Sequence, residues 1–247
     1  MSMADLTMRD LKVPVPEGLE PDEETRWRWR RYMEDYLDCV ASIDRNTGRL
    51  LDYLDDRGLT DDTIVIYTSD QGFFLGEHGW FDKRFIYEES LRMPFLVRYS
   101  RLVAPGSTCD AITLNVDMAQ TILDLADVPQ PFWMQGRSMV PLLAGKTPTD
   151  WRQEMYYRYW MHLDGAHRVQ AHYGIRDHKH KLVHYPGKAA AGLGHAADDR
   201  EPAWELFDLD ADPHELTSVH DDPAYAQVRA DLEARLWRLQ QQVGDRP

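Results

Sequence analysis

Cysteine is nearly absent from this 247-residue chain, which holds only Cys39 and Cys109. The two lie in different kinds of segment, an expected helix and an expected loop, so they indicate neither a disulfide framework nor a zinc-binding spacing. Long apolar runs are missing too: no stretch of about eighteen apolar residues occurs, and the first ten residues carry charges of both signs. We therefore expect no membrane span and no signal peptide. The sequence as written indicates a cytoplasmic protein but does not establish a location.

Basic residues are outnumbered by acidic ones. Lys and Arg total 28 against 42 Asp and Glu, which gives a formal net charge of −14. This excess argues against nucleic acid or a membrane surface as a partner, because both carry negative charge. The remaining composition, 43% hydrophobic and 28% charged, is typical of a globular protein with one large or two modest domains.

The first 147 residues divide into a lead-in and an α/β portion. Residues 1–23, rich in proline and acidic residues, predict an extended lead-in that lies over some surface. In residues 24–147, apolar side chains at helical spacing predict a long helix from Glu24 to Arg57. Thr63–Thr68 and Pro94–Tyr99 are typical of strands buried on both faces of a parallel sheet. Asp117 is the expected N-cap of a further helix.

Residues 148–247 differ from the preceding part in their residue pattern and predict a small α+β subdomain. Four short aromatic-rich strands separated by turns favour an antiparallel sheet, and apolar spacing from Pro223 to Gln242 predicts a terminal helix that packs on it. Gly187–Asp199, rich in Ala and Gly, indicates a loop. The fold class expected for the whole chain is therefore α/β: part of a mixed sheet flanked by helices, plus this smaller sheet.

Two adjacent oxygen-bearing side chains follow the first expected strand. Asp70 and Gln71 come just after its carboxyl end, where open α/β sheets place ligands, and Gly72 allows a sharp turn there. A carboxylate and an amide oxygen suit Ca²⁺ or Mg²⁺. The simpler alternative is that Asp70 caps the following turn and Gln71 is a solvated loop residue.

The segment Thr68–Ser90 reads TSDQGFFLGEHGWFDKRFIYEES. Its order of Ser-Asp-Gln-Gly, Leu-Gly-Glu-His-Gly, a lysine and Tyr-Glu-Glu-Ser resembles the second signature region of type I sulfatases, which are members of the alkaline-phosphatase-like superfamily. The resemblance implies that Asp70 and Gln71 are two ligands of a single active-site Ca²⁺. It also implies that Lys83 binds a sulfate oxygen.

Electrostatics supports this transfer of roles. A sulfuryl group in transfer carries its charge on peripheral oxygens, so a divalent cation and a lysine ammonium directed at them lower the barrier. Lys83 could instead be a loop cation paired with Asp82. His78 is open between assisting the leaving group and shaping a glycine-flanked turn.

The resemblance covers nearly everything after residue 30 and is to sulfatases of the N-acetylglucosamine-6-sulfatase and mucin-desulfating type. One further pair of site residues lies in its later part. Period-2 spacing puts His172 and Arg176 on one strand face, and the family likeness implies that this face reaches the pocket rim. They could contact a substrate sugar; a plain surface strand is the alternative.

One essential feature of the family is missing. Type I sulfatases use a formylglycine made from Cys or Ser in a Cys/Ser-x-Pro/Ala-x-Arg motif, and neither Cys39 nor Cys109 begins one. Asp70 and Gln71 alone also leave a Ca²⁺ site short of the six to eight oxygens that it prefers. We therefore expect the chain to be inactive alone unless a second chain supplies the N-terminal half.

Three functions remain at this point. The first is a sulfatase fragment or split subunit for sulfate esters of sugars or arenes. The second is a non-catalytic module, derived from a sulfatase, that binds carbohydrate or a partner protein. The third, a two-metal phosphoesterase of the same superfamily, is disfavoured because such enzymes use additional histidine ligands near the aspartate.

Overall fold

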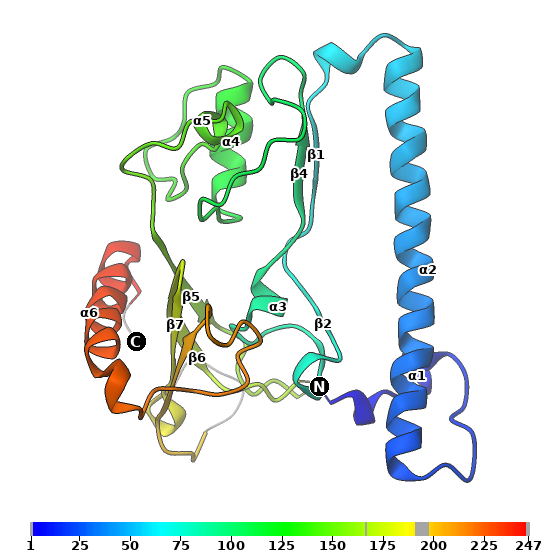
Figure 1. Cartoon of the computed structure of the whole chain (residues 1–247), viewed down its shortest axis with the longest axis vertical. Helices are drawn as coiled ribbons and strands as arrows, with labels where there is room; N and C mark the ends of the chain where they lie inside the picture. The colour runs from blue at the N-terminus through cyan, green and yellow to red at the C-terminus, as the bar shows by residue number, and fades with distance from the viewer. Residues whose placement is uncertain (1, 166, 191–197, 246–247) are drawn as a thin grey trace. The chain divides into compact units, whose positions relative to one another are not determined.

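The computed structural model of the protein describes residues 2–165, 167–190 and 198–245 (Figure 1). The chain forms two compact units, Met1–Lys83 with Glu89–Arg101 (unit 1) and Arg84–Glu88 with Leu102–Pro247 (unit 2). This division differs from the expected boundary at residue 147. The reason is that residues 102–147 are tied to the C-terminal part: the Trp151 indole donates to the Ile112 carbonyl at 2.9 Å, and Arg152 pairs with Asp117.

Unit 1 is dominated by the helix α2 (Pro21–Asp56). Pro21 occupies the first turn, Glu20 and Glu23 form a capping box, and Gly58 follows the end of the helix at φ +64°. The long helix predicted from Glu24 to Arg57 is thus confirmed, although it begins three residues earlier. No residue of α2 is buried. Among the described residues, no helix combines the length and apolar content needed to cross a bilayer.

The lead-in is not simply extended, because it contains the 3-10 helix η1 (Met3–Asp5) and the short helix α1 (Met8–Leu11). Met3, Leu6 and Leu11 are buried in a small apolar core of unit 1. Partly buried apolar side chains pack around them: Val15, Trp27, Tyr32 and Phe81. Burial of these side chains removes apolar surface from water, which favours folded turns over an extended strap.

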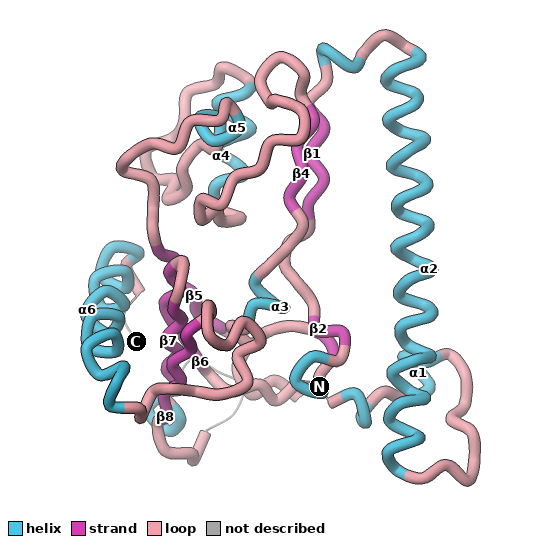
Figure 2. Tube along the Cα trace, in the orientation of Figure 1, coloured by secondary structure: helices cyan, strands magenta, loops and turns pink. Residues whose placement is uncertain are grey.

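The two strands expected in the α/β portion are present as β1 (Val65–Thr68) and β4 (Phe95–Arg98). Their predicted arrangement was wrong, because they pair with each other in antiparallel register and neither is buried on both faces (Figure 2). They form a two-stranded sheet, so both are edge strands. The continuous apolar runs that suggested a doubly covered sheet are here exposed in part, at Tyr67 and Leu96.

Beyond β1, unit 1 holds the hairpin of β2 (Phe74–Leu75) and β3 (Phe81–Asp82), closed by the 3-10 helix η3 (Glu77–Gly79). The other short elements near these strands are η2 (Thr60–Asp62) and α3 (Glu88–Leu91). The Trp29 indole of α2 donates to the Leu75 carbonyl at 2.7 Å. The hairpin is therefore fixed against the N-terminal part of α2.

Unit 2 contains the helices α4 (Asp117–Leu125) and α5 (Val140–Leu143). The prediction that Asp117 is the N-cap of α4 was wrong. Val116 holds that position, and Asp117 is the first helical residue. Its fully buried carboxylate accepts from the backbone N–H groups of Leu114 and Arg137, both at 2.8 Å, and pairs with Arg152. These two hydrogen bonds and the ion pair compensate for the cost of burying the charged carboxylate.

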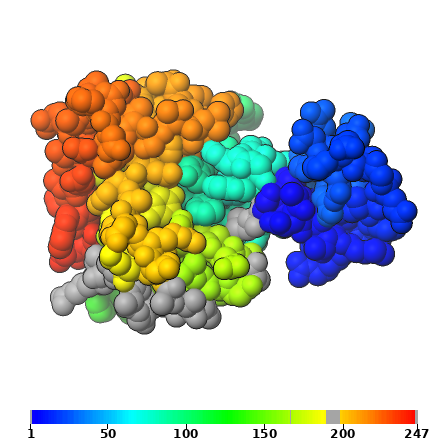
Figure 3. Space-filling model, turned by 90° about the horizontal axis from the view of Figure 1, so that it is seen from below, coloured from blue at the N-terminus to red at the C-terminus, as the bar shows by residue number. Residues whose placement is uncertain are grey.

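The predicted small sheet is confirmed as β5 (Glu154–Tyr159), β6 (His172–Asp177), β7 (His180–Tyr185) and β8 (Ala203–Asp208), antiparallel throughout in that order. The predicted terminal helix is α6 (Ala226–Val243), preceded by η5 (Pro223–Tyr225). Figure 3 shows α6 in red directly against the yellow and orange segments of unit 2. Of the loop expected at 187–199, Gly187–Ala190 form η4, while residues 191–197 lie outside the described residues.

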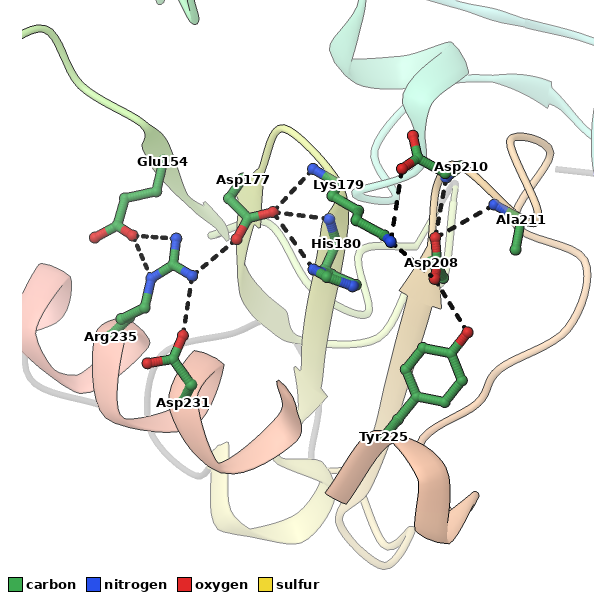
Figure 4. A network of polar contacts seen from close by, with 10 residues as sticks. All are labelled: Glu154, Asp177, Lys179, His180, Asp208, Asp210, Ala211, Tyr225, Asp231 and Arg235. Atoms are coloured by element: carbon green, nitrogen blue, oxygen red, sulfur yellow. Dashed lines mark hydrogen bonds and ion pairs between the residues drawn. The ribbon is translucent and has the colours of Figure 1, made fainter. Parts of the chain in front are cut away.

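The core of unit 2 joins the sheet to α6 through Ile175, Leu182, Leu206, Leu232 and Leu236, all buried. Arg235 of α6 adds a polar clamp: its guanidinium lies 2.5 Å from Glu154 of β5, 2.8 Å from Asp177 of β6 and 3.1 Å from Asp231 (Figure 4). At the edge strand β8, the Tyr225 hydroxyl donates to Asp208 at 3.0 Å. Apolar burial and these charge-assisted contacts together fix α6 on one face of the sheet.

Candidate functional site

Asp70 and Gln71 lie in unit 1, directly after β1, as the sequence predicts. Asp70 is exposed, and its carboxylate accepts from the Ser69 hydroxyl at 3.2 Å. Gly72 follows, and its N–H donates to the Ser90 carbonyl at 2.9 Å. A Cβ at this position would clash with backbone carbonyl oxygens of Glu89 and Arg92. Close backbone approach, and not a sharp turn, therefore selects glycine here.

His78 is the central residue of η3 and has φ +56°, in the left-handed region. Its ring stacks on Trp80 with centroids 5.3 Å apart and meets the edge of Phe74 at 5.8 Å. Its Nε2 lies 3.6 Å from a carboxylate oxygen of Glu89. These contacts support the turn-shaping alternative, and a role for His78 in assisting the leaving group stays a prediction.

Lys83 directly follows β3, and about a third of its side chain is exposed. Its Nζ lies 5.8 Å from the centroid of the Phe73 ring, which in turn stacks on Tyr36 of α2 at 6.5 Å. Asp82 is near, with its carboxylate 3.8 Å from the ammonium. The ammonium thus lies over an aromatic ring that packs on α2 and beside one carboxylate, and the side chain is partly exposed.

The donor set of this segment suits a hard cation but is incomplete. The Asp70 carboxylate and the Gln71 amide oxygen are ligand types that Ca²⁺ prefers, and Ca²⁺ takes six to eight such oxygens. Within the described ranges, His, Cys, Asp and Glu side chains form no group of three or more that could hold a metal ion. Asp70 and Gln71 are therefore of the ligand type that suits Ca²⁺, but they do not make a complete site.

His172 and Arg176 lie in unit 2, and the predicted common face is confirmed, because both contact the segment that follows Lys83 in sequence. Phe85 stacks on His172 with centroids 5.5 Å apart, and Glu88 binds Arg176 at 3.1 Å. Gly174 lies between His172 and Arg176 on the strand, and its lack of a side chain leaves room for Ile86. A Cβ added at Gly174 would lie 2.9 Å from the Ile86 Cδ1. Residues 85–88 therefore run along this face of β6.

His172 is 1% exposed, so the alternative of a plain surface strand is wrong for it. Its Nδ1 lies 2.8 Å from the Gln170 carbonyl, and burial lowers its pKa to about 4. Besides Phe85, the rings of Tyr157, Tyr159 and Tyr185 surround it with centroids 5.3 to 5.7 Å away. Contact of His172 or Arg176 with a substrate sugar stays a prediction.

A buried ion network beside Arg176 was not anticipated from the sequence. Lys181 is wholly inaccessible, and its Nζ lies 2.9 Å from Glu88 and 2.6 Å from Glu215. Burial acts to raise the pKa of Glu88, but Lys181 and Arg176 outweigh it and hold that pKa below the ordinary value. Burial raises the pKa of Glu215. In the sequence, the one signal for this buried network is that Lys181 directly precedes the apolar pair Leu-Val in an expected strand.

An open pocket of about 610 Å³ lies in unit 2 between α6 and the β6–β7 turn. It holds none of the predicted site residues. Its charged lining groups are already paired with one another or with neighbours: Arg235 with Asp177 and Asp231, and Lys179 with Asp208 and Asp210 (Figure 4). The pocket therefore adds no free charge to the predicted chemistry.

Comparison with known proteins gives two family matches. Residues 76–242 match the model of the N-sulphoglucosamine sulphohydrolase C-terminal domain, and residues 12–128 match the sulfatase model. An N-acetylglucosamine-6-O-sulfatase of Bacteroides thetaiotaomicron is 45% identical over 221 residues, which are 89% of this chain and 37% of that protein. A multifunctional alkaline phosphatase superfamily protein of Trinickia caryophylli is 31% identical over 85% of this chain and 41% of its own length.

A solved structure described as a complex with its substrate, D-glucosamine-2-N,6-O-disulfate, is also similar. It is 44% identical, has a TM-score of 0.81, and matches 91% of this chain and 43% of that chain. The chain thus spans less than half the length of each of these relatives.

Proposed function

Because this chain belongs to the sulfatases and carries a C-terminal domain of the N-sulphoglucosamine sulphohydrolase type, we propose that it forms the sulfate-binding side of a sulfatase active site. The reaction is hydrolysis of a sulfate ester, in which water replaces the sugar alcohol on sulfur and the sugar leaves with a free hydroxyl. The observation that carries the proposal is the anchoring of Lys83 over Phe73, one short hairpin beyond Asp70 and Gln71.

Each proposed role follows from charge. The Lys83 ammonium binds a peripheral sulfate oxygen and stabilises the charge that builds there during transfer. Asp70 and Gln71 would hold part of a Ca²⁺ site, and the ion would supply further positive charge to the sulfate when bound. The nucleophile and the other metal ligands would come from a part of the enzyme that these residues do not include.

The substrate class that we propose is a sulfated glucosamine. Support comes from the names of two relatives, the N-acetylglucosamine-6-O-sulfatase and the structure bound to a glucosamine disulfate. An aryl sulfate, which lacks the sugar hydroxyls, is the expected poorer substrate. A phosphonate monoester hydrolase from Silicibacter pomeroyi shares the fold at 28% identity and a TM-score of 0.74, so a phosphonate monoester is the useful comparison substrate.

A covalent chimera tests the proposal. The part of the Bacteroides thetaiotaomicron sulfatase that this chain does not cover would be joined to this chain in one polypeptide. We expect release of sulfate from 6-O-sulfated N-acetylglucosamine, and Lys83→Ala should lower kcat by about 10²- to 10³-fold, as for loss of one oxyanion donor.

Lys179→Ala, at a half-exposed lysine in unit 2, is the matched control and should leave the rate unchanged. A folded chimera in which Lys83→Ala and Lys179→Ala behave alike would contradict the proposed role of Lys83. A chimera that cleaves the phosphonate monoester faster than the sulfated sugar would contradict the proposed substrate class.

A further inference from the structure

An uncovered apolar surface runs along α2 in unit 1. Five large apolar side chains of this helix are each between 42% and 55% exposed: Leu37, Val40, Ile43, Leu50 and Tyr53, which we term the α2 stripe. We propose that the α2 stripe is the docking surface for the portion of the sulfatase fold that this chain does not span. The inference rests on the proposed function, because it takes this chain to be one side of a larger active site.

The spacing of the stripe shows which kind of surface it meets. One line of side chains follows α2 in alternating steps of three and four, and all but Thr47 are apolar or aromatic: Met33, Tyr36, Val40, Ile43, Thr47, Leu50 and Leu54. Leu37, Leu51 and Tyr53 widen this line on both sides, so the apolar arc covers roughly 200° of the helix at 3.6 residues per turn. An arc this wide is typical of a helix packed on a globular core, whereas a two-stranded coiled coil needs only the narrow seam.

The same helix face is in contact with other side chains of unit 1 at its N-terminal end. Trp29, Tyr32 and Tyr36 lie on it, and they contact Leu75, Phe81 and Phe73 of the hairpin segment. The α2 stripe begins one residue after Tyr36. It therefore continues a helix face that already makes contacts with other parts of unit 1.

A second open surface in unit 1 adds to the first. Tyr67 and Leu96 are directly opposed across β1 and β4, so they project from the same face of that sheet, and they are 40% and 60% exposed. A two-stranded sheet is marginally stable on its own and gains stability from further strands or a covering layer. Helix and sheet thus both lack a covering partner within the described residues of unit 1.

The relatives indicate what that partner is. This chain has the same fold as part of a larger chain, with a TM-score of 0.81 over 91% of its length, yet it matches 43% of that chain. A second copy of this chain is a poorer occupant. The chain carries a net charge of −14, and Asp44 lies within the arc of the stripe, directly after Ile43, so two copies would bring like charges together.

The test is association between separate polypeptides, measured without substrate. This chain would be mixed with the part of the Bacteroides thetaiotaomicron sulfatase that it does not cover, and the mass of the complex and amide exchange would be followed. We expect a one-to-one complex with slowed exchange over residues 37–53. Val40→Asp with Ile43→Asp should weaken binding at least about 100-fold, because two buried apolar contacts become buried charges.

Ala41→Asp with Ser42→Asp is the matched control, since it adds the same charges to the adjacent, polar side of the same exposed turn. It should change the dissociation constant by less than about threefold. Both double variants should unfold at the same denaturant concentration as the parent chain, because all four side chains are exposed in it.

Equal binding by the two double variants would overturn the inference, as would protection confined to residues outside α2. A homodimer that Val40→Asp with Ile43→Asp dissociates, with no binding of the added part, would identify a second copy as the occupant and would also overturn it. The covalent chimera separates the two proposals. If the chimera is active but association does not depend on the α2 stripe, only this inference fails. If association depends on the α2 stripe but the chimera is inactive, the proposed function fails.

Discussion

The Nζ of Lys181 lies 2.6 Å from a carboxylate oxygen of Glu215, and both side chains are completely buried. Glu88 contacts the same ammonium at 2.9 Å, and its backbone N–H donates to Glu215 at 2.7 Å. Glu88 belongs to the Tyr-Glu-Glu-Ser motif, whereas Lys181 and Glu215 belong to the small C-terminal sheet and the turn after it. All three residues belong to unit 2, so the network holds Glu88 in place within that unit.

Removing the cation at the centre of this network should be costly. Lys181→Ala leaves two buried carboxylates without their shared partner, and loss of one member of a buried pair typically costs about 3–5 kcal/mol. Urea unfolding followed by circular dichroism measures the change. Lys179→Ala, two residues away at a half-exposed ion pair, should cost less than about 1 kcal/mol. A loss below 1 kcal/mol for Lys181→Ala would mean that the network contributes no net stability.

Burial of His172 predicts a pH dependence of folding stability. Its pKa is about 4 in the folded chain against 6.5 in the unfolded chain, so the unfolded state takes up a proton first as pH falls. Its contribution is therefore complete above pH 6.5, decreases below it, and is lost near pH 4, to a total of about 3 kcal/mol at most. The free energy of unfolding measured at intervals between pH 7.5 and pH 4.5 should show this decline.

The variant His172→Phe isolates that contribution, because a phenyl ring can occupy the same aromatic cluster without titrating. Its unfolding free energy should fall less steeply with decreasing pH than that of the parent chain. Part of the slope should remain, since burial also lowers the pKa of His184 to about 4. His178→Phe, at an exposed position, should keep the parent's slope. Equal slopes for His172→Phe and the parent would rule out His172 as the titrating group.

Local patterns in the sequence predicted most elements of the fold, and the family matches confirm both the resemblance and the fold class. The spacing of apolar residues located α2 and α6, and aromatic alternation located the four-stranded sheet. The pairing of β1 with β4 was mispredicted because a short apolar run fits a doubly buried parallel strand and an uncovered antiparallel one equally well.

The site was predictable to the extent that its residues are contiguous. Asp70, Gln71 and Lys83 were proposed from one motif and stay a prediction, whereas the contacts of Phe73 with Lys83 and Tyr36 required the packing of hairpin and helix. The burial of His172 depended on Phe85, which lies 87 positions earlier in sequence. Contacts at such separations have no local signature in composition or periodicity.

Two glycines of unit 1 should respond in opposite ways to alanine. At Gly72 an added Cβ clashes with backbone carbonyls that cannot move independently, so Gly72→Ala should destabilise the chain by more than about 1 kcal/mol. Gly48 lies inside α2 with nothing within 4 Å of an added Cβ, so Gly48→Ala should stabilise it by about 0.5–1 kcal/mol. Thermal unfolding of both variants measures the difference. Similar shifts of the same sign would contradict the close backbone approach at Gly72.

The Phe73 ring should matter to catalysis only through Lys83. In the covalent chimera, Phe73→Leu keeps apolar bulk against Tyr36 but removes the aromatic face beneath the ammonium, which is worth about 0.5–1 kcal/mol at a partly exposed site. The expected loss in kcat/KM is therefore about two- to fivefold, and Phe73→Tyr should recover it. In the Lys83→Ala background Phe73→Leu should have no further effect, because the cation that the ring positions is gone. An equal loss in both backgrounds would show that Phe73 acts on the fold of the hairpin and not on the lysine.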